Sequence, residues 1–295
     1  MGDAAASTVL SGYSFLEAPR WHDGRIWCSD FYTGQVVSAR EDGSDLRLEA
    51  EVPEQPSGLG WLPDGRMLVV SMRDRRILRR EADGSLVVHA DLGEHATGHL
   101  NDMTVDRSGR AYVGNFGFDL MSGAPLETAS LHRVDPDGTV TAVADELWFP
   151  NGSAITRDSV LLVNETFGNR VSAFDLTDDG RLVNRRVWAE FAPLPTDRAI
   201  EQVLARATVS GDGGCVDAEG GFWIADATGG RLLRVVEGGE ITDELRPGIN
   251  VYACALGGAD GRTLFACVAP DFHEAARRSE RAARLLAFRV PIPAG

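Results

Sequence analysis

A short pattern that recurs six times constrains the fold of this chain more than any other feature. Each copy has a tight turn, an apolar run and a polar closing residue, as in HDGRIWCSD at 22–30 and PDGRMLVVS at 63–71. The turns centre on Gly24, Gly65, Gly109, Asp158, Gly220 and Gly261, so successive copies are separated by 41, 44, 49, 62 and 41 residues. A second strand-like run follows each copy, and further runs such as LRLEAEVP at 46–53 fit between them. Four strands in about 40 residues is the size of a propeller blade.

The repeat predicts an all-β fold, a six-bladed β-propeller of four-stranded blades that occupies residues 1–295 as a single domain. The runs are rich in Val, Ile, Leu and aromatic residues, and glycine-containing turns close them as hairpins. The last repeat ends after its third strand, so we expect the segment TVLSG at 8–12 to supply the fourth strand and close the ring. A β-sandwich is the alternative, but it gives no reason for a blade-sized period.

Charge and composition exclude several functions. The chain has 44 acidic and 29 basic residues, a net charge of −15, and all 29 basic residues are arginine. Without lysine, a P-loop nucleotidase, a pyridoxal-phosphate enzyme and a Schiff-base aldolase are excluded. The negative charge argues against nucleic-acid binding. No apolar run reaches about 18 residues and the start, Met1 to Thr8, lacks signal-peptide features, so we expect no membrane partner and a cytoplasmic location. The four cysteines are scattered singly, and we expect them to be reduced.

The repeat also predicts where the chemistry lies. In a propeller, the first strand of each blade lies nearest the central channel, and all first strands enter from the same face. Counting back seven to nine residues from each turn gives the residues expected to ring that mouth: Glu17, Ser57, Asn101, Asn151, Asp212 and Tyr252. Asn, Asp and Ser are common at strand starts in general. Two carboxylates and two amides at matched repeat positions nevertheless predict a hard-cation site in the channel, which suits Ca²⁺ best.

Around these residues the sequence resembles the SMP-30/gluconolactonase/LRE family of regucalcin-like lactonases. The segments that carry the resemblance are LEAPRWHDGRIWCSD at 16–30, LNDMTVDRSGRAYVGN at 100–115, FPNGSAIT at 149–156, GDGGCVDAEGGFWIAD at 211–226 and ACALGGADGRTLFACVA at 253–269. The resemblance implies a six-bladed propeller that holds one divalent metal in its channel. It also implies a metal-dependent lactonase, a hydrolase whose partner is a small-molecule lactone or ester.

The resemblance assigns roles to individual residues. Glu17, Asn151 and Asp212 match the family's metal ligands, and Asn101 matches the asparagine that holds a metal-bound water or the substrate. Zn, Mn and Mg are alternatives to Ca as the ion. Asp212 is our candidate for the base that activates water, with His99 as the rival base or a wall of the substrate site. Sugar-lactonase members carry an arginine at the position of His99, so a substrate less polar than gluconolactone is expected.

Three longer segments, 115–130, 192–207 and 269–283, are expected on the same face and predict a lid. The second contains a helical pattern, DRAIEQVLARA, with Asp197 as its predicted N-cap. We expect Phe116 to give the lid an apolar side. Arg198 and His273 are expected to meet an anionic or hydroxylated part of the substrate, and Tyr252 to contact it from the ring.

Two other functions remain open at this stage. The same metal site on the same fold can serve another reaction, such as phosphotriester hydrolysis or a strictosidine-synthase-like condensation. A non-catalytic propeller that binds a cation or ligand is the second alternative. Lactone hydrolysis that depends on a metal would distinguish the lactonase from both of these alternatives.

Overall fold

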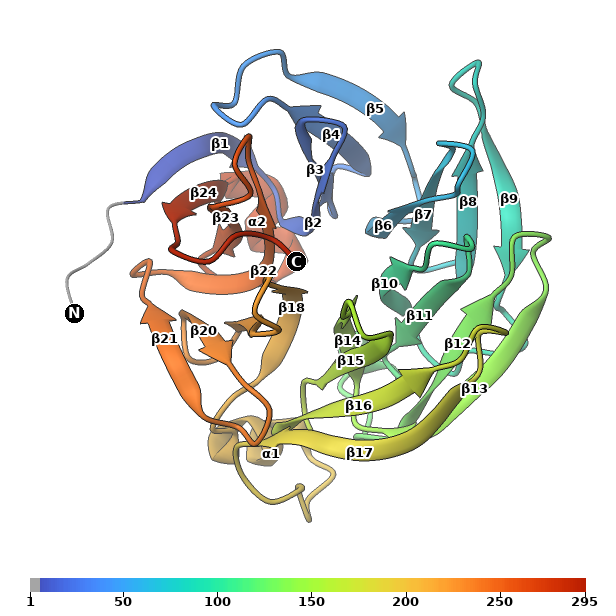
Figure 1. The fold of residues 1–295 in the computed structure, drawn as a ribbon, viewed down its shortest axis with the longest axis vertical. Helices are drawn as coiled ribbons and strands as arrows, with labels where there is room; N and C mark the ends of the chain where they lie inside the picture. Colours follow the sequence, from blue (N-terminus) through green and yellow to red (C-terminus); the bar gives the residue numbers. More distant parts are fainter. Residues whose placement is uncertain (1–5) are drawn as a thin grey trace.

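The computed structural model describes residues 6–295, so residues 1–5 of the predicted domain and of the segment before Thr8 lie outside the described part. Its strands form six four-stranded sheets around a central axis, which confirms the predicted six-bladed propeller (Figure 1). Blade 1 has the strands β2 Leu16–His22, β3 Arg25–Asp30, β4 Gln35–Ala39 and β5 Arg47–Glu51. Blade 2 has β6 Pro56–Trp61, β7 Met67–Ser71, β8 Arg76–Arg80 and β9 Leu86–Asp91.

The remaining blades follow the same order from the axis outward. Blade 3 has β10 Leu100–Val105, β11 Ala111–Asn115, β12 Ala129–Val134 and β13 Val140–Leu147. Blade 4 has β14 Pro150–Ile155, β15 Val160–Glu165, β16 Arg170–Leu176 and β17 Leu182–Glu190. Blade 5 has β18 Gly211–Val216, β19 Phe222–Asp226, β20 Arg231–Val235 and β21 Ile241–Leu245. Blade 6 has β22 Asn250–Gly257, β23 Thr263–Ala269, β24 Ala283–Arg289 and β1 Ser7–Tyr13.

Blade 6 closes the ring with strands from both ends of the chain. β1 pairs antiparallel with β24, with Leu10 opposite Leu285, and the two strands lie side by side in Figure 1. This confirms that the segment at 8–12 supplies the missing outer strand. Two pairs of neighbouring thiols, Cys28–Cys267 and Cys215–Cys254, lie where blade 6 meets blades 1 and 5, and all four cysteines are free. The sequence spacing gave no sign of this pairing.

The turns between the first and second strands lie where the repeat places them. Gly65 has a φ of 86° and its N–H bonds the Leu62 carbonyl at 2.9 Å, a left-handed turn that glycine adopts without strain. In blade 4 the left-handed residue is Ser159, with a φ of 58°, one position after the predicted centre at Asp158.

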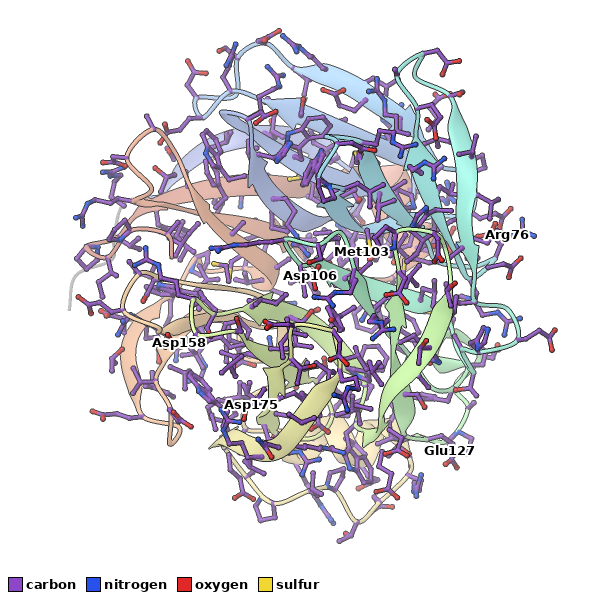
Figure 2. All side chains as sticks on the ribbon, turned by 45° about the vertical axis from the view of Figure 1, so that its right-hand side comes forward. Arg76, Met103, Asp106, Glu127, Asp158 and Asp175 are labelled. Carbon is purple, nitrogen blue, oxygen red and sulfur yellow. The ribbon has the colours of Figure 1, made fainter. Side chains whose placement is uncertain are left out.

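The apolar core lies between neighbouring blades. One cluster joins Trp223 of blade 5 to Leu264 and Phe288 of blade 6, and similar clusters fill the other interfaces. Met103, on the innermost strand of blade 3, is fully buried, whereas charged side chains such as Arg76 project from the rim (Figure 2). The described residues contain no helix long and apolar enough to cross a membrane.

The three predicted lid segments hold the only helical turns of residues 6–295: η1 Leu120–Ser122, α1 Ile200–Arg206 and α2 Glu274–Glu280. The predicted N-cap at Asp197 is wrong, because α1 begins after Ala199 and has no side-chain cap. The Arg198 carbonyl accepts a hydrogen bond from the Leu126 N–H at 2.8 Å, which holds the chain extended there. The Asp197 Oδ2 atom instead lies 3.9 Å from Nη1 of Arg206.

Candidate functional site

The structure brings the six predicted ring residues to one mouth of the channel. Each innermost strand begins at the same face and contacts the innermost strands of both neighbouring blades. Glu17, Ser57, Asn101, Asn151 and Asp212 are each the second residue of their strand, and Tyr252 is the third residue of β22. Five of the six are almost fully buried, and Asp212 is half-buried.

A local irregularity aims these side chains. The pairing between the first and second strands shifts register in every blade, for example between Glu17 and Arg20 and between Gly211 and Gly214. In five blades the ring residue lies in this interrupted stretch, and in blade 1 Glu17 is the last paired residue before it. Because a bulge bends the strand and re-aims its side chains, the same distortion repeated six times turns them toward a shared mouth.

Close backbone contact keeps the ring narrow. A Cβ on Gly152 would lie 2.4 Å from the Asp212 carbonyl oxygen and 2.5 Å from the Gly213 Cα. A Cβ on Gly213 would lie 2.5 Å from the Cβ of Ala253. Glycine after the ring residue therefore allows blades 4, 5 and 6 to bring Asn151 and Asp212 near each other.

Two acidic side chains of the ring lack a cationic partner. In residues 6–295, neither Glu17 nor Asp212 forms an ion pair. Burial, followed by repulsion from Asp212, raises the pKa of Glu17 well above its usual range. Burial also raises the pKa of Asp212, while its hydrogen bond with Asn151 opposes the shift. Both carboxylates therefore need a positive charge to remain ionised.

The amide side chains are held by neighbours that the sequence did not single out. Asn151 Nδ2 donates to Thr166 Oγ1 at 3.1 Å, and Thr166 Oγ1 donates to the Gly211 carbonyl at 2.7 Å. Asn164 Nδ2 donates to the Asp212 carbonyl at 2.6 Å. Asn101 Nδ2 is buried and has no hydrogen-bond partner among residues 6–295. A repeat count cannot reveal these supports, because they lie on second strands and act across blade boundaries.

The predicted ligand set fits a hard divalent cation. No three His, Cys, Asp or Glu side chains in the described chain are grouped to hold a metal by themselves. The candidate set has two carboxylates, Glu17 and Asp212, and the amide oxygen of Asn151, whose Nδ2 is already engaged. Such an all-oxygen set suits Ca²⁺, and a cation there would offset the burial and repulsion that raise the carboxylate pKa values.

One ion pair inside the channel was missed by the sequence reasoning. Arg20 bonds Asp102 at 2.6 Å and the Met103 carbonyl at 2.8 Å. Asp102 follows Asn101 directly, and Arg20 lies three residues after Glu17, so both belong to the motifs already quoted. Asp102 adds to the negative charge near Asp212, and Arg20 balances it.

His99 and Phe116 form part of the wall beside the ring. The centroids of the His99 imidazole and the Phe116 phenyl group are 5.7 Å apart. Phe116 stacks on Phe149, with 4.6 Å between the centroids of their phenyl groups. Burial, with Arg73 as the next cause, lowers the pKa of His99, which keeps the imidazole neutral near pH 7. Phe116 is the half-buried edge of an apolar cluster in which the first two lid segments pack against two residues of blade 4. We call it the lid cluster: Phe118, Leu126, Phe149, Phe167 and Val203.

The other three predicted substrate contacts differ in their placement. Tyr252 is buried in the ring and packs on Phe15, with centroids 4.7 Å apart. Arg198 is engaged elsewhere, because it bonds Glu127 at 2.9 Å and lies over the ring of Trp148. His273 is exposed just before α2. In residues 6–295, neither Arg198 nor His273 hydrogen-bonds a ring residue.

The third lid segment is fastened across the mouth. Arg73, from the turn after β7, bonds Glu274 at 2.7 Å and Gln55 at 2.9 Å. The Tyr32 hydroxyl donates to the Phe272 carbonyl, and Arg278 donates to the Tyr32 carbonyl. The segment 269–283 is thus tied to blades 1 and 2, opposite the lid cluster over blades 3 to 5.

Comparison with known proteins agrees with the fold and the sequence motifs. A family model described as "SMP-30/Gluconolactonase/LRE-like region" matches residues 15–269. Regucalcin of Danio rerio is 28% identical over 255 residues, which cover 84% of this chain and 81% of that protein. A pentonolactonase of Haloferax volcanii is 27% identical over 259 residues, covering 86% of this chain and 81% of that protein.

Solved structures share the architecture. A luciferin-regenerating enzyme matches with a TM-score of 0.80 at 18% identity, over 99% of this chain and 97% of that chain. A gluconolactonase from Xanthomonas campestris matches with a TM-score of 0.73 at 22% identity, over 98% of this chain and 91% of that chain. At this level of identity the likeness concerns the fold.

Proposed function

The chain belongs to the SMP-30/gluconolactonase/LRE-like family, and on that premise we propose that it opens a lactone ring at the channel mouth with the help of a divalent cation. One observation carries the proposal: the buried Glu17 and the half-buried Asp212, two carboxylates without ionic partners among residues 6–295, lie beside the amide of Asn151 at one mouth. Two relatives bear lactonase names, a 6-deoxy-6-sulfogluconolactonase of Pseudomonas putida and the pentonolactonase.

The chain's own residues divide the work of hydrolysis. Glu17, Asn151 and Asp212 would hold the cation, which when bound polarises the lactone carbonyl and stabilises the developing oxyanion. Asn101 positions the attacking water. Asp212 takes a proton from that water while the water oxygen bonds to the carbonyl carbon of the lactone. The ring C–O bond then breaks, and the leaving oxygen takes the proton.

The wall of the site favours a substrate less polar than a sugar lactone. His99 and Phe116 present a neutral imidazole and an aromatic face beside the ring. The buried lid cluster packs behind Phe116 and supports its aromatic face. An aliphatic or aromatic lactone suits this wall better than a polyhydroxylated lactone, whose hydroxyl groups need hydrogen-bond partners.

The test is a screen of sugar, aliphatic and aromatic lactones with an organophosphate control, run with Ca²⁺, Mn²⁺ or Zn²⁺ and with chelator. We expect lactone turnover that chelator abolishes, and a loss of about 100-fold or more in kcat for Asp212→Asn. The matched control is Asp23→Asn, because Asp23 is an exposed carboxylate in a turn after β2. Wild-type turnover in metal-replete Asp212→Asn would contradict the role of Asp212. Hydrolysis of the organophosphate alone would favour the phosphotriesterase alternative.

A further inference from the structure

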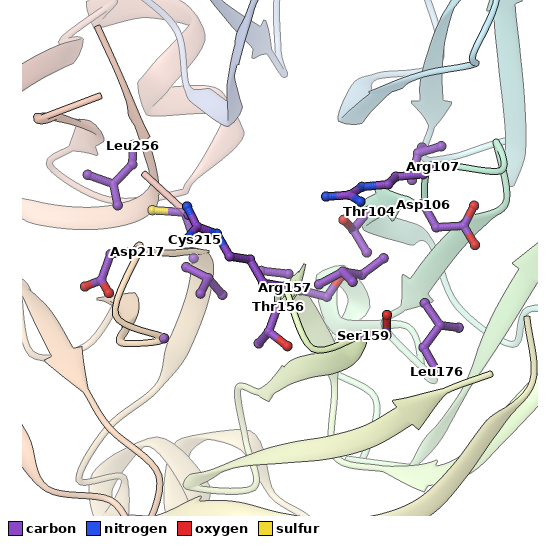
Figure 3. Close-up of a pocket in the computed structure, with 18 of the residues that line it drawn as sticks. Thr104, Asp106, Arg107, Thr156, Arg157, Ser159, Leu176, Cys215, Asp217 and Leu256 are labelled. Atoms are coloured by element: carbon purple, nitrogen blue, oxygen red, sulfur yellow. The ribbon is translucent and has the colours of Figure 1, made fainter. Parts of the chain in front are cut away.

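A large pocket lies at the opposite mouth of the channel from the candidate active site. Its volume is about 980 Å³, and it is lined by the ends of the innermost strands and the turns that follow them: 19–21, 104–108, 153–159, 214–220 and 254–256. Glu17 and Asp212 lie at the starts of these same strands. We call this cavity the far-mouth pocket, and none of the proposed lactonase residues lines it (Figure 3).

Two arginines extend into the far-mouth pocket from equivalent turns of neighbouring blades. Arg107 follows Asp106 in the turn closed by Gly109 N to Asp106 O at 2.9 Å. Arg157 follows Thr156 in the turn closed by Ser159 N to Thr156 O at 3.1 Å. Figure 3 shows both side chains reaching into the pocket, Arg157 toward the side where Cys215 lies. Both are exposed, and the turns hold them at the same mouth.

Neither arginine is neutralised by a direct partner. In the described part of the chain, neither side chain makes a hydrogen bond or an ion pair, although the protein has 44 acidic residues. The carboxylates beside them are already engaged: Asp106 bonds Arg110 and Asp217 bonds Arg234, each at 2.6 Å. The other lining acids, Asp158, Asp178 and Glu219, form no ion pair with either arginine. Ten guanidinium N–H groups thus remain free for a ligand.

Besides the lining acids, the pocket wall offers neutral hydroxyl groups. Thr104, Ser153 and Thr156 bring hydroxyls to the lining. Of the other two lining arginines, Arg20 is held by Asp102 and the Met103 carbonyl, and Arg110 is held by Asp106. The pocket therefore combines a pair of free cations with a hydroxyl-bearing wall.

We propose that the far-mouth pocket binds a phosphate monoester, with Arg107 and Arg157 holding the phosphate and the hydroxyl-bearing wall facing the organic part. A guanidinium fork matches the oxygens of phosphate in two parallel hydrogen bonds. A phosphate monoester carries close to two negative charges at pH 7 on three oxygens, so it offers acceptors to both guanidinium groups, whereas a monocarboxylate offers one charge on two oxygens. The site is separate from the channel mouth used for hydrolysis, so the proposal does not depend on the lactonase activity.

The test is calorimetric titration of the full chain with glucose 6-phosphate, inorganic phosphate and succinate as separate probes. We expect Arg107→Gln and Arg157→Gln each to weaken glucose 6-phosphate binding by about tenfold or more, and the double variant to abolish it. The control is Arg262→Gln in the corresponding turn of blade 6, outside the pocket lining, where the arginine side chain also makes no hydrogen bond or ion pair with residues 6–295. This variant should bind within about twofold of wild type.

A second readout locates the binding. Cys215 lines the pocket and is half-buried, whereas Cys28, Cys254 and Cys267 are buried. Glucose 6-phosphate should slow alkylation of Cys215 by a neutral maleimide in wild type but not in the double variant. The proposal is overturned if no phosphate probe binds at about 10 mM, if Arg262→Gln weakens binding as much as the pocket variants, or if Cys215 is not protected. Tighter binding of succinate would overturn the phosphate assignment, and equal binding of inorganic phosphate would overturn the role of the hydroxyl-bearing wall.

Discussion

At the residue scale, His99 shows how a local environment sets chemical character. Its pKa is lowered by burial and by Arg73, so it stands beside the mouth as a neutral imidazole. The sequence located it, because it precedes Asn101 by two positions in a recognisable motif. It could not locate Arg73 beside it, since Arg73 belongs to another blade and is fixed there by Glu274, which is 201 residues away.

Replacing His99 tests how the wall selects substrates. We expect His99→Arg to shift the ratio of kcat/KM for a sugar lactone over an aliphatic lactone upward by about tenfold, because an arginine adds donors for hydroxyl groups. The measurement is initial rates on both lactones for wild type and variant, with exposed His95→Arg as the control. An unchanged ratio would show that the His99 position does not read substrate polarity.

His132, on β12, makes the fold sensitive to acid. It is 2% exposed, its Nδ1 has no hydrogen-bond partner within the described part of the chain, and burial with the nearby His95 lowers its pKa to about 4. The unfolded chain binds a proton at this residue near pH 6.5, so this contribution to stability is present above pH 6.5 and is lost as the pH falls toward 4.

The prediction is that His132→Phe removes this loss. Between pH 7 and pH 5, the free energy of unfolding of wild type should fall by about 2 kcal/mol more than that of the variant. Urea unfolding at both pH values measures the difference. Parallel losses in the two proteins would mean that His132 does not carry the effect.

At the scale of elements, the repeat predicted where each innermost strand begins but not how it bends. The repeated turns lie seven to nine residues after the ring residues, so the positions of Asn151 and Asp212 can be counted in one sequence. The register shifts at these residues depend on pairing with the second strand and were not predicted. The predicted N-cap at Asp197 is wrong for a related reason, since the hydrogen bond between Leu126 and Arg198 outweighs the local preference of Asp for a helix start.

Gly152 is the element-scale test, because its added Cβ would meet the backbone of β18. We expect Gly152→Ala to separate β14 from β18, to destabilise the fold by about 1–3 kcal/mol and to lower kcat by about tenfold as Asp212 moves. Gly93→Ala is the control, because the Cβ there would meet only a side-chain oxygen of Asp91 at 3.0 Å. Wild-type stability and turnover in Gly152→Ala would contradict the close packing of these strands.

At the scale of the whole molecule, the acidic side chains occur in two different settings, the surface and the channel. Most acidic side chains lie in exposed turns or pair with arginines, as Asp64 does with Arg66. Three carboxylates, Glu17, Asp102 and Asp212, are gathered inside the channel. Counting residues in the sequence is enough to establish the excess of acidic side chains and the absence of lysine. It could not show that Arg107 and Arg157 remain unpaired at the other mouth, because ion pairing is decided by contacts across blades.

Ring closure through β1 is the last feature that a measurement can test. Leu10 is the one fully buried residue of this strand, and it packs with Leu16, Phe265 and Leu285. We expect Leu10→Ala to lower the free energy of unfolding by about 2–4 kcal/mol in one cooperative transition, because the blades lose their closing contact together. Leu48→Ala on β5, where the side chain is 55% exposed, should cost less than about 0.5 kcal/mol.

The same variant should expose the edge of β24. A weakened β1 leaves the unpaired backbone of its neighbour open to solvent, which speeds amide hydrogen exchange and promotes edge-to-edge association. We expect faster exchange in β24 of Leu10→Ala than in the strands of blade 3, on the far side of the ring. If the two variants cost the same and exchange in β24 stays at the wild-type rate, β1 does not hold the propeller closed, and the packing between innermost strands must do so alone.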